Sequence, residues 1–180
     1  LTQPKDSVAQ KQKILRSIDK ISNSDPEFWE KAYSEGRDGW DLGSSTPIFN
    51  KWIHTLQSKK SICVLGAGNG WDAINFAEKG HNVTAVDFAD HPIKNMKKLI
   101  KEKSLSMKIL KLDIFDLPID YSNFFDIVVE YTCFCAISPL KREKYIKTVS
   151  MILKKSALFV GILFPIAPSI KSSTPPYNVN

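Results

Sequence analysis

A glycine-rich loop stands between a short apolar run and a helical stretch near the middle of the chain. The loop reads Gly66-Ala67-Gly68-Asn69-Gly70 and follows the apolar run 62–66. Glycines let a backbone approach a ligand closely, and the N-terminus of the following helix offers free N–H groups. A second apolar run ends at Asp87, about 20 residues on, where a carboxylate can accept hydrogen bonds from both ribose hydroxyls. Together these features predict a nucleoside-binding site.

The spacing of the glycines distinguishes between two kinds of nucleoside cofactor. A dinucleotide-binding loop reads G-x-G-x-x-G and would need glycine at position 71, but Trp71 occupies that position. The pattern here is G-x-G-x-G, which resembles the loop of Rossmann-like methyltransferases, whose cofactor has no pyrophosphate. Asp113 follows a third apolar run, where such enzymes commonly place an acidic residue near the adenine amino group. Its alternative role is to cap the turn at 116–118. The spacing therefore favours S-adenosylmethionine.

The elements that must position these residues alternate between short apolar runs and helical stretches. Alternation of this kind indicates an α/β fold, Rossmann-like, with a mostly parallel sheet and helices on both of its faces. The predicted strands cover residues 62–66, 82–86, 107–112, 125–131 and 157–164, and the predicted helices cover 71–79, 92–103 and 139–153.

The residues before the first strand read as helices. Apolar residues at helical spacing predict a helix over 8–21, and Asp25-Pro26 is typical of a helix start, with Gly36 as its stop. Another helix is predicted over 47–57. We expect a single domain over residues 1–180, with 1–58 as an N-terminal helical cap over the site and 59–180 as the Rossmann-like core.

Charge and composition narrow the function classes. The formal charge of +6 comes largely from scattered lysines, many on amphipathic helical stretches, so we expect no nucleic-acid partner. No run of about 18 apolar residues is present and residues 1–11 lack the apolar core of a signal peptide, so we expect no membrane association and a cytoplasmic protein. Cys63, Cys133 and Cys135 lie in apolar runs, which predicts buried reduced thiols and no metal site.

The chain resembles the thiopurine and halide/thiol methyltransferases over residues 26–178. The segments that carry the resemblance are WEKAYSEG at 29–36, GWDLG at 39–43, TP at 46–47 and FDIVVEYTCFCAI at 125–137, with Pro139, Arg142, Tyr145 and PPY at 175–177 further on. Tyr131 is usual in the plant-type and bacterial thiol/halide branch, where the animal thiopurine enzymes carry arginine. Family members continue beyond the Pro-Pro-Tyr segment into a helix and two more strands, and we expect those C-terminal strands to be missing here.

The resemblance implies a set of residues that bind S-adenosylmethionine. Ala67 and Gly68 of the glycine loop and Phe88, which follows Asp87, are added to the residues carried over from the family. The full set is Trp29, Tyr33, Trp40, Gly66, Ala67, Gly68, Asp87, Phe88, Asp113, Ile114 and Tyr131. The branch often has tryptophan where Tyr33 stands, so an aromatic ring is retained. Tyr177 is expected to position the substrate, because the corresponding tyrosine of the resembling enzymes lies near the substrate pocket.

The chemistry of these side chains agrees with the resemblance. Trp29 and Tyr33 are four residues apart on one helix face, and their aromatic faces would attract a sulfonium cation, although simple core packing would also place them there. Methyl transfer to a thiolate or halide needs close approach and exclusion of water but no general base. We accordingly interpret His54, His81 and His91 as surface residues.

The expected reaction is therefore methyl transfer from S-adenosylmethionine to a small anionic or thiol substrate: a thiol, bisulfide, thiocyanate, a halide or a thiopurine. Two alternatives remain open. One is a methyltransferase for another small molecule or a chalcogen oxyanion such as tellurite or selenite, and the other is a non-catalytic nucleoside-binding protein.

Overall fold

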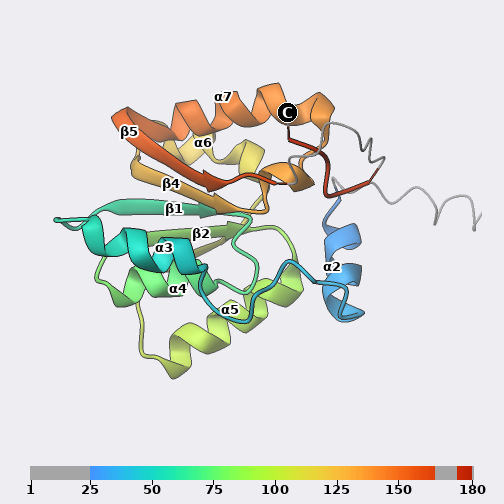
Figure 1. The fold of residues 1–180 in the computed structure, drawn as a ribbon, viewed down its shortest axis with the longest axis horizontal. Coiled ribbons are helices and arrows are strands. Elements are labelled where there is room, and N and C mark those ends of the chain that lie inside the picture. Colours follow the sequence, from blue (N-terminus) through green and yellow to red (C-terminus); the bar gives the residue numbers. More distant parts are fainter. Residues whose placement is uncertain (1–24, 165–173, 180) are drawn as a thin grey trace, which may run out of the picture.

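A five-stranded sheet forms the centre of the computed structural model, which describes residues 25–164 and 174–179 (Figure 1). The strands are β1 (Ser61–Leu65), β2 (Asn82–Asp87), β3 (Lys108–Lys111), β4 (Phe125–Tyr131) and β5 (Leu153–Ile162). They lie in the order β3-β2-β1-β4-β5, and every neighbouring pair is parallel. The strand order reverses between β1 and β4, so the connections that leave these two strands run in opposite directions and leave a crevice outside their carboxyl ends, where ligands of such sheets bind.

Helices cover both faces of the sheet (Figure 1). Helices α6 and α7 lie on one face, α3, α4 and α5 lie on the other, and α2 stands beyond the carboxyl ends of the strands. Their bounds are α2 (Pro26–Ser34), α3 (Pro47–Trp52), α4 (Trp71–Glu78), α5 (Asp90–Glu102), α6 (Pro118–Tyr121) and α7 (Arg142–Ile152). Short 3-10 turns occupy η1 (Ile53–Thr55), η2 (Ile114–Asp116), η3 (Phe134–Ala136) and η4 (Pro139–Lys141).

Alternation along the strands divides the apolar side chains between two cores. In β1, Cys63 and Leu65 pack with the residues of α6 and α7, whereas Ile62 and Val64 pack with those of α3 and α4. Successive side chains of a strand point to opposite faces, and the central strands β1, β2 and β4 are buried on both, so they are largely apolar, whereas the edge strands β3 and β5 are partly exposed. The two cores fix the sheet between its helical layers and so fix the crevice at the carboxyl ends.

The predicted fold class is confirmed, and the predicted elements recur with shifted ends. The helix at Pro26 begins at the expected residue, with Asp25 as its N-cap. The helix predicted over 47–57 is regular only to Trp52 and continues as a 3-10 turn. The helix predicted over 8–21 lies outside the described residues.

Two features of the fold were not predicted. Strand β5 begins at Leu153 and not at 157, because the polar stretch 154–156 was interpreted as a connection. The short helix α6 begins at Pro118, where a turn was expected, since Pro at the first helical position favours helix but four residues show no period. Among the described residues, no helix is long and apolar enough to cross a membrane.

Candidate active site

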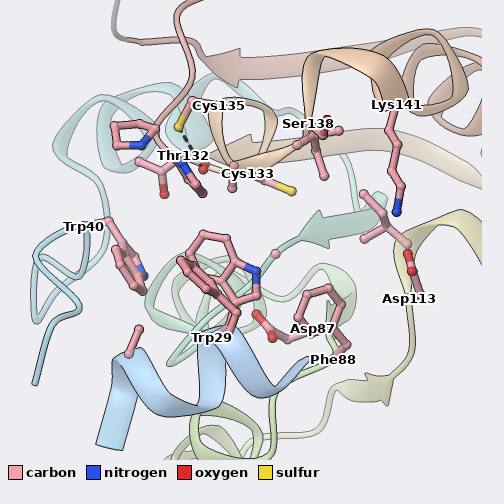
Figure 2. A pocket seen from close by; sticks show the side chains of 18 of the residues that line it. Trp29, Trp40, Asp87, Phe88, Asp113, Thr132, Cys133, Cys135, Ser138 and Lys141 are labelled. Atoms are coloured by element: carbon pink, nitrogen blue, oxygen red, sulfur yellow. Dashed lines mark hydrogen bonds between the residues drawn. The ribbon is translucent and has the colours of Figure 1, made fainter. Parts of the chain in front are cut away.

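A cavity of about 490 Å³ opens at the carboxyl ends of the strands, between α2 and the segment that follows β4 (Figure 2). Predicted site residues that line this cavity are Trp29, Tyr33, Trp40, Gly66, Asp87, Phe88, Asp113 and Ile114. A smaller cavity of about 50 Å³ shares Tyr33, Trp40 and Gly66 with the first and is lined also by Ala67, Gly68 and Tyr131. The structure therefore brings the whole predicted cofactor-binding set to one place.

The glycine loop approaches other parts of the chain so closely that added side chains would be crowded. A Cβ atom on Gly66 would lie 3.0 Å from Cys133 Sγ, and one on Gly68 would lie 3.0 Å from the Tyr33 hydroxyl oxygen. The absence of these Cβ atoms lets α2 and the segment after β4 close over the end of β1. The glycines thus shape the cavity as well as exposing backbone to it.

Asp87 ends β2 and bonds the glycine loop. Its Oδ2 accepts a hydrogen bond from Gly68 N–H at 2.9 Å, and its Oδ1 accepts one from Ala89 N–H at 3.0 Å. Burial raises the pKa of the Asp87 carboxyl, while the backbone N–H groups oppose that shift. Each carboxylate oxygen has further lone pairs, so Asp87 can accept ligand hydroxyls while it holds the loop.

Asp113 caps a turn and also lines the cavity, and its predicted role beside an adenine amino group stays a prediction. Its Oδ1 accepts a hydrogen bond from Phe115 N–H at 3.0 Å and so caps η2, and the residue also lines the cavity. Phe88 and Ile114, beside the two aspartates, add apolar surface to this end of the cavity. A flat heterocycle with a polar edge suits such an arrangement.

Aromatic side chains from α2 and the following loop pack on one another at the cavity wall. The rings of Trp29 and Trp40 meet edge to face with centroids 5.4 Å apart, and Trp40 Nε1–H donates a hydrogen bond to the Tyr33 hydroxyl at 3.3 Å. Tyr33 also stacks on the ring of His91, at 5.9 Å. Burial raises the pKa of Tyr33, which therefore stays a neutral ring with an electron-rich face.

The loop that carries Trp40 is bonded to the start of α4, which sequence reasoning missed. Asp41 Oδ1 accepts a hydrogen bond from Trp71 Nε1–H at 2.8 Å, and Asp41 Oδ2 accepts one from Asn69 Nδ2. Further along, Thr46 donates from N and Oγ1 to the Asp72 carboxylate, at 2.7 and 2.8 Å. Trp71, which excluded a dinucleotide pattern, therefore serves to hold this loop over the glycine loop.

The segment after β4 supplies much of the opposite wall. Figure 2 shows Thr132, Cys133, Cys135 and Ser138 across the cavity from Asp87 and Phe88. Sequence reasoning assigned no site role to these four residues. The signal that could have found them is topological: β4 neighbours β1 at the strand-order reversal, so its carboxyl end must open onto the same crevice.

Tyr177 lies next to the cavity without being among the residues that line it, and its substrate role stays a prediction. Its N–H donates to the Cys135 carbonyl at 2.7 Å, and its carbonyl accepts a hydrogen bond from Arg142 Nη2 at 3.4 Å. The preceding Pro175 and Pro176 do line the cavity. The segment is therefore bonded to the wall after β4.

One histidine was interpreted wrongly. His81 is buried rather than on the surface, because it follows α4 and its Nδ1 accepts a hydrogen bond from Lys60 N–H at 3.2 Å. His54 is exposed, and His91 stacks on Tyr33. Within the described ranges no histidine lines the main cavity, and no group of three or more His, Cys, Asp or Glu side chains is placed to hold a metal ion.

Solved structures share this fold at low sequence identity. The 1,6-didemethyltoxoflavin-N1-methyltransferase of Burkholderia thailandensis, solved with 1,6-didemethyltoxoflavin and S-adenosylhomocysteine bound, is 23% identical with a TM-score of 0.64, over 89% of this chain and 64% of that one. An S-adenosylmethionine-dependent methyltransferase from Clostridium acetobutylicum is 23% identical with a TM-score of 0.54, over 63% of this chain and 46% of that one. The fold is that of class I methyltransferases.

Sequence relatives are more specific. "Probable thiol methyltransferase 2" of Arabidopsis thaliana is 28% identical over 84% of this chain and 67% of its own length. Thiocyanate methyltransferase 1 of Brassica oleracea is 26% identical over 84% of this chain and 66% of its own length. Thiopurine S-methyltransferase of Photobacterium profundum is 23% identical over 86% of this chain and 78% of its own length. The chain thus spans about two thirds of the length of the plant relatives.

The sequence model of the family described as thiopurine S-methyltransferase matches residues 24–180, which is nearly the whole chain. The matched region contains every residue of the cavity described above. The chain therefore belongs to the thiopurine S-methyltransferase family, a family of S-adenosylmethionine-dependent methyltransferases.

Proposed function

We propose that this chain binds S-adenosylmethionine in the main cavity and transfers its methyl group to a small soft nucleophile. The observation that carries the proposal is the arrangement of one cavity: two aspartates at one end, an aromatic wall from α2, and a largely apolar wall after β4. The relatives named as thiol, thiocyanate and thiopurine methyltransferases support the class of acceptor.

The residues present fit the cofactor. Asp87 offers acceptor oxygens where a ribose diol would bind, and Asp113 with Phe88 and Ile114 offers a polar edge and apolar faces for adenine. Trp29, next to them, presents an aromatic ring to a cationic sulfonium. When bound, the cofactor supplies an electrophilic methyl group.

The protein's own contribution is to bind, orient and exclude water. Packed aromatic rings and the wall after β4 enclose the cavity, and no buried base is needed for an acceptor that arrives as an anion. Besides the polar Thr132, Ser138 and Lys141, the lining on this side includes Cys135, Ile137 and Pro176, whose side chains consist of carbon and sulfur. Such a surface favours weakly hydrated nucleophiles such as bisulfide, thiocyanate or iodide over strongly hydrated oxyanions.

An acceptor panel tests the proposal. The protein is incubated with S-adenosylmethionine and, in separate reactions, with bisulfide, thiocyanate, iodide, a thiopurine or tellurite. Headspace gas chromatography detects volatile methyl products, and liquid chromatography detects the methylated purine. We expect turnover with at least one sulfur or halide acceptor.

Two results would contradict the proposal in different ways. Turnover of tellurite alone would replace the acceptor class while keeping the cofactor. The absence of cofactor binding by calorimetry would reject the methyltransferase assignment altogether and leave a non-catalytic protein.

A further inference from the structure

Glu130 is a fully buried carboxyl group at the carboxyl end of β4. Its relative exposure is 0%, and it pairs across the sheet with Leu65 of β1 on one side and with Gly161 of β5 on the other. It does not line the cavity itself. Burying a carboxyl group in this way is costly unless its hydrogen bonds are made, so the contacts of Glu130 show what the group is for.

Glu130 holds the turn that follows β4. Its Oε2 accepts hydrogen bonds from Cys133 N–H at 2.9 Å and from Phe134 N–H at 2.8 Å. The turn begins at Thr132, whose φ of 62° lies in the left-handed region that a β-branched residue rarely adopts. A strained conformation of this kind persists only when its surroundings impose it, and here Glu130 provides two hydrogen bonds that do so.

This turn carries two parts of the cavity wall. Thr132, Cys133 and Cys135 line the cavity directly. The carbonyl of Cys135 also accepts the hydrogen bond from Tyr177 N–H, which anchors the segment containing Pro175 and Pro176. One buried carboxyl group thus supports both the turn after β4 and, through it, the segment 174–179.

Gly161 makes room for this carboxyl group. A Cβ atom at position 161 would lie 2.8 Å from Glu130 Oε1 and 3.1 Å from the ring of Phe159. Among the residues that the structure describes, Oε1 has no hydrogen-bond partner. A buried, half-satisfied carboxyl group does not improve stability over an apolar side chain. Its place under the cavity wall therefore points to a role in the site.

The groups around Glu130 leave its charge uncompensated. They are the thiols of Cys133 and Cys135 on its own turn and the hydroxyl of Tyr145 of α7. The cation of Arg142, also on α7, acts on Cys135 and lies over the ring of Phe134. Burial raises the pKa of Glu130 to about 7. Glutamine at this position would reproduce the protonated form, with one oxygen still able to accept both N–H groups.

We propose that Glu130 is a positioning residue for the acceptor side of the cavity, because its carboxyl oxygen fixes the turn at 132–136 and the bonded segment 174–179. This proposal rests on the proposed function in one respect, because it takes the reaction to be methyl transfer to an acceptor bound in the cavity. The positioning itself is a statement about backbone hydrogen bonds and can be measured without any turnover.

The test compares substitutions at Glu130 with a matched control on the same strand. Glu130→Leu removes the acceptor oxygen, Glu130→Gln keeps it, and Gly161→Ala crowds it from β5. Asp126→Asn is the control, because Asp126 is also a hydrogen-bonded carboxylate of β4, bonded to Ser61 N–H at 2.8 Å, but does not line the cavity. Readouts are the calorimetric Kd for S-adenosylmethionine, kcat and KM for the acceptor found in the panel, and amide hydrogen exchange.

We expect Glu130→Leu to lower kcat/KM for the acceptor by about tenfold or more, the order expected when buried N–H groups lose their acceptor, while the cofactor Kd changes less than about threefold. The amides of Cys133 and Phe134 should exchange about tenfold faster. Glu130→Gln should restore both readouts, Gly161→Ala should give a weaker form of the same defect, and Asp126→Asn should leave both at the wild-type values.

Three outcomes would overturn the proposal. One is wild-type acceptor kinetics in Glu130→Leu, and another is an equal loss of cofactor affinity and acceptor turnover, which indicates general destabilisation. The third is a defect in Glu130→Gln as large as in Glu130→Leu. If Glu130→Leu does not fold, Gly161→Ala and Glu130→Gln decide the question. If the wild-type protein methylates nothing, the proposed function fails, and hydrogen exchange at Cys133 and Phe134 still tests the positioning.

Discussion

At the scale of single residues, the carboxylate of Asp87 connects the backbone of the glycine loop to the space where a ligand would bind. It accepts the N–H of Gly68 and of Ala89 and faces the cavity from the end of β2. A substitution here removes an acceptor for two backbone groups and, under the proposed function, for the ribose hydroxyls of the cofactor as well. Its effect on cofactor binding is therefore expected to exceed that of an ordinary polar contact.

Asp87→Ala should weaken binding of S-adenosylmethionine by about 1–3 kcal/mol, because buried hydrogen bonds are lost from both the loop and the ligand. Isothermal titration calorimetry measures the change. Asp90→Ala is the matched control, since Asp90 is an exposed aspartate three residues on, paired with Lys111 at 2.7 Å. Equal affinity in the Asp87→Ala and wild-type proteins would show that the carboxylate does not reach the cofactor.

Single residues also show which parts of the candidate site could be predicted from the sequence and which could not. The spacing of Gly66, Gly68 and Asp87 placed three site residues, because a loop between a strand and a helix has a fixed geometry. The role of Trp71 was not predicted, since its partner Asp41 is 30 residues away in the chain and nothing local indicates the hydrogen bond. The left-handed Thr132 was also missed, because such residues are usually glycine or asparagine.

At the scale of elements, the turn from β1 into α4 depends on its last glycine. Gly70 is the N-cap of α4 with φ of 83°, and a Cβ atom there would lie 2.4 Å from Met96 Cγ of the buried α5 side chain. Gly80, after the same helix, has a similar φ of 85° but nothing within 4 Å of an added Cβ. Both glycines have a left-handed backbone, but only at Gly70 is there no room for an added Cβ atom.

Gly70→Ala should therefore destabilise the protein more than Gly80→Ala does. Both substitutions cost about 1–2 kcal/mol for a left-handed alanine, and overpacking against Met96 should add about 1–3 kcal/mol at position 70 alone. Urea unfolding followed by circular dichroism gives both values. Equal destabilisation would mean that Met96 moves aside without cost.

The elements themselves were largely predictable. The strand β4 was predicted with its observed ends, because its run from Phe125 to Tyr131 is mostly apolar in spite of Asp126 and Glu130 and follows the polar stretch 121–123. Strand β5 starts earlier than predicted, since Lys154 reads as polar although it pairs with Asp126 on the neighbouring strand at 2.7 Å. Pairing between strands is a non-local property, and the pattern of one segment does not contain it.

At the scale of the whole molecule, the reversal of strand order explains the division of the site into a predictable and an unpredictable half. The end of β2, with Asp87, and the end of β1, with the glycine loop, follow rules that relate residues close in sequence. The wall from Thr132 to Ser138 faces them only because β4 lies beside β1. That placement follows from the topology of the complete sheet.

Stability of the whole protein should depend on pH through Glu130. Its pKa is about 7 in the folded protein against an ordinary 4.5, so the folded state binds the proton more tightly. The free energy of unfolding should fall as pH rises from about 4.5 to about 7, by roughly 3–4 kcal/mol at most, since each pKa unit corresponds to about 1.4 kcal/mol.

The comparison with Glu130→Gln isolates this contribution from other groups that titrate in the same range. The difference in free energy of unfolding between the variant and the wild-type protein should increase in favour of glutamine across that interval and be constant outside it. Urea unfolding at a series of pH values measures it. A difference that is independent of pH would mean that Glu130 does not take up a proton on folding in this pH range.

The two thiols in the wall after β4 have a consequence for the proposal that the cavity binds a methylating agent. Alkylation of cysteine proceeds through the thiolate, and burial raises the pKa of Cys133 well above its usual value and that of Cys135 to about 11. At pH 7 only about one Cys135 thiol in ten thousand is ionised. Under the proposed function, these buried thiols would resist methylation by the bound cofactor, whereas a soluble thiolate or halide would enter already charged.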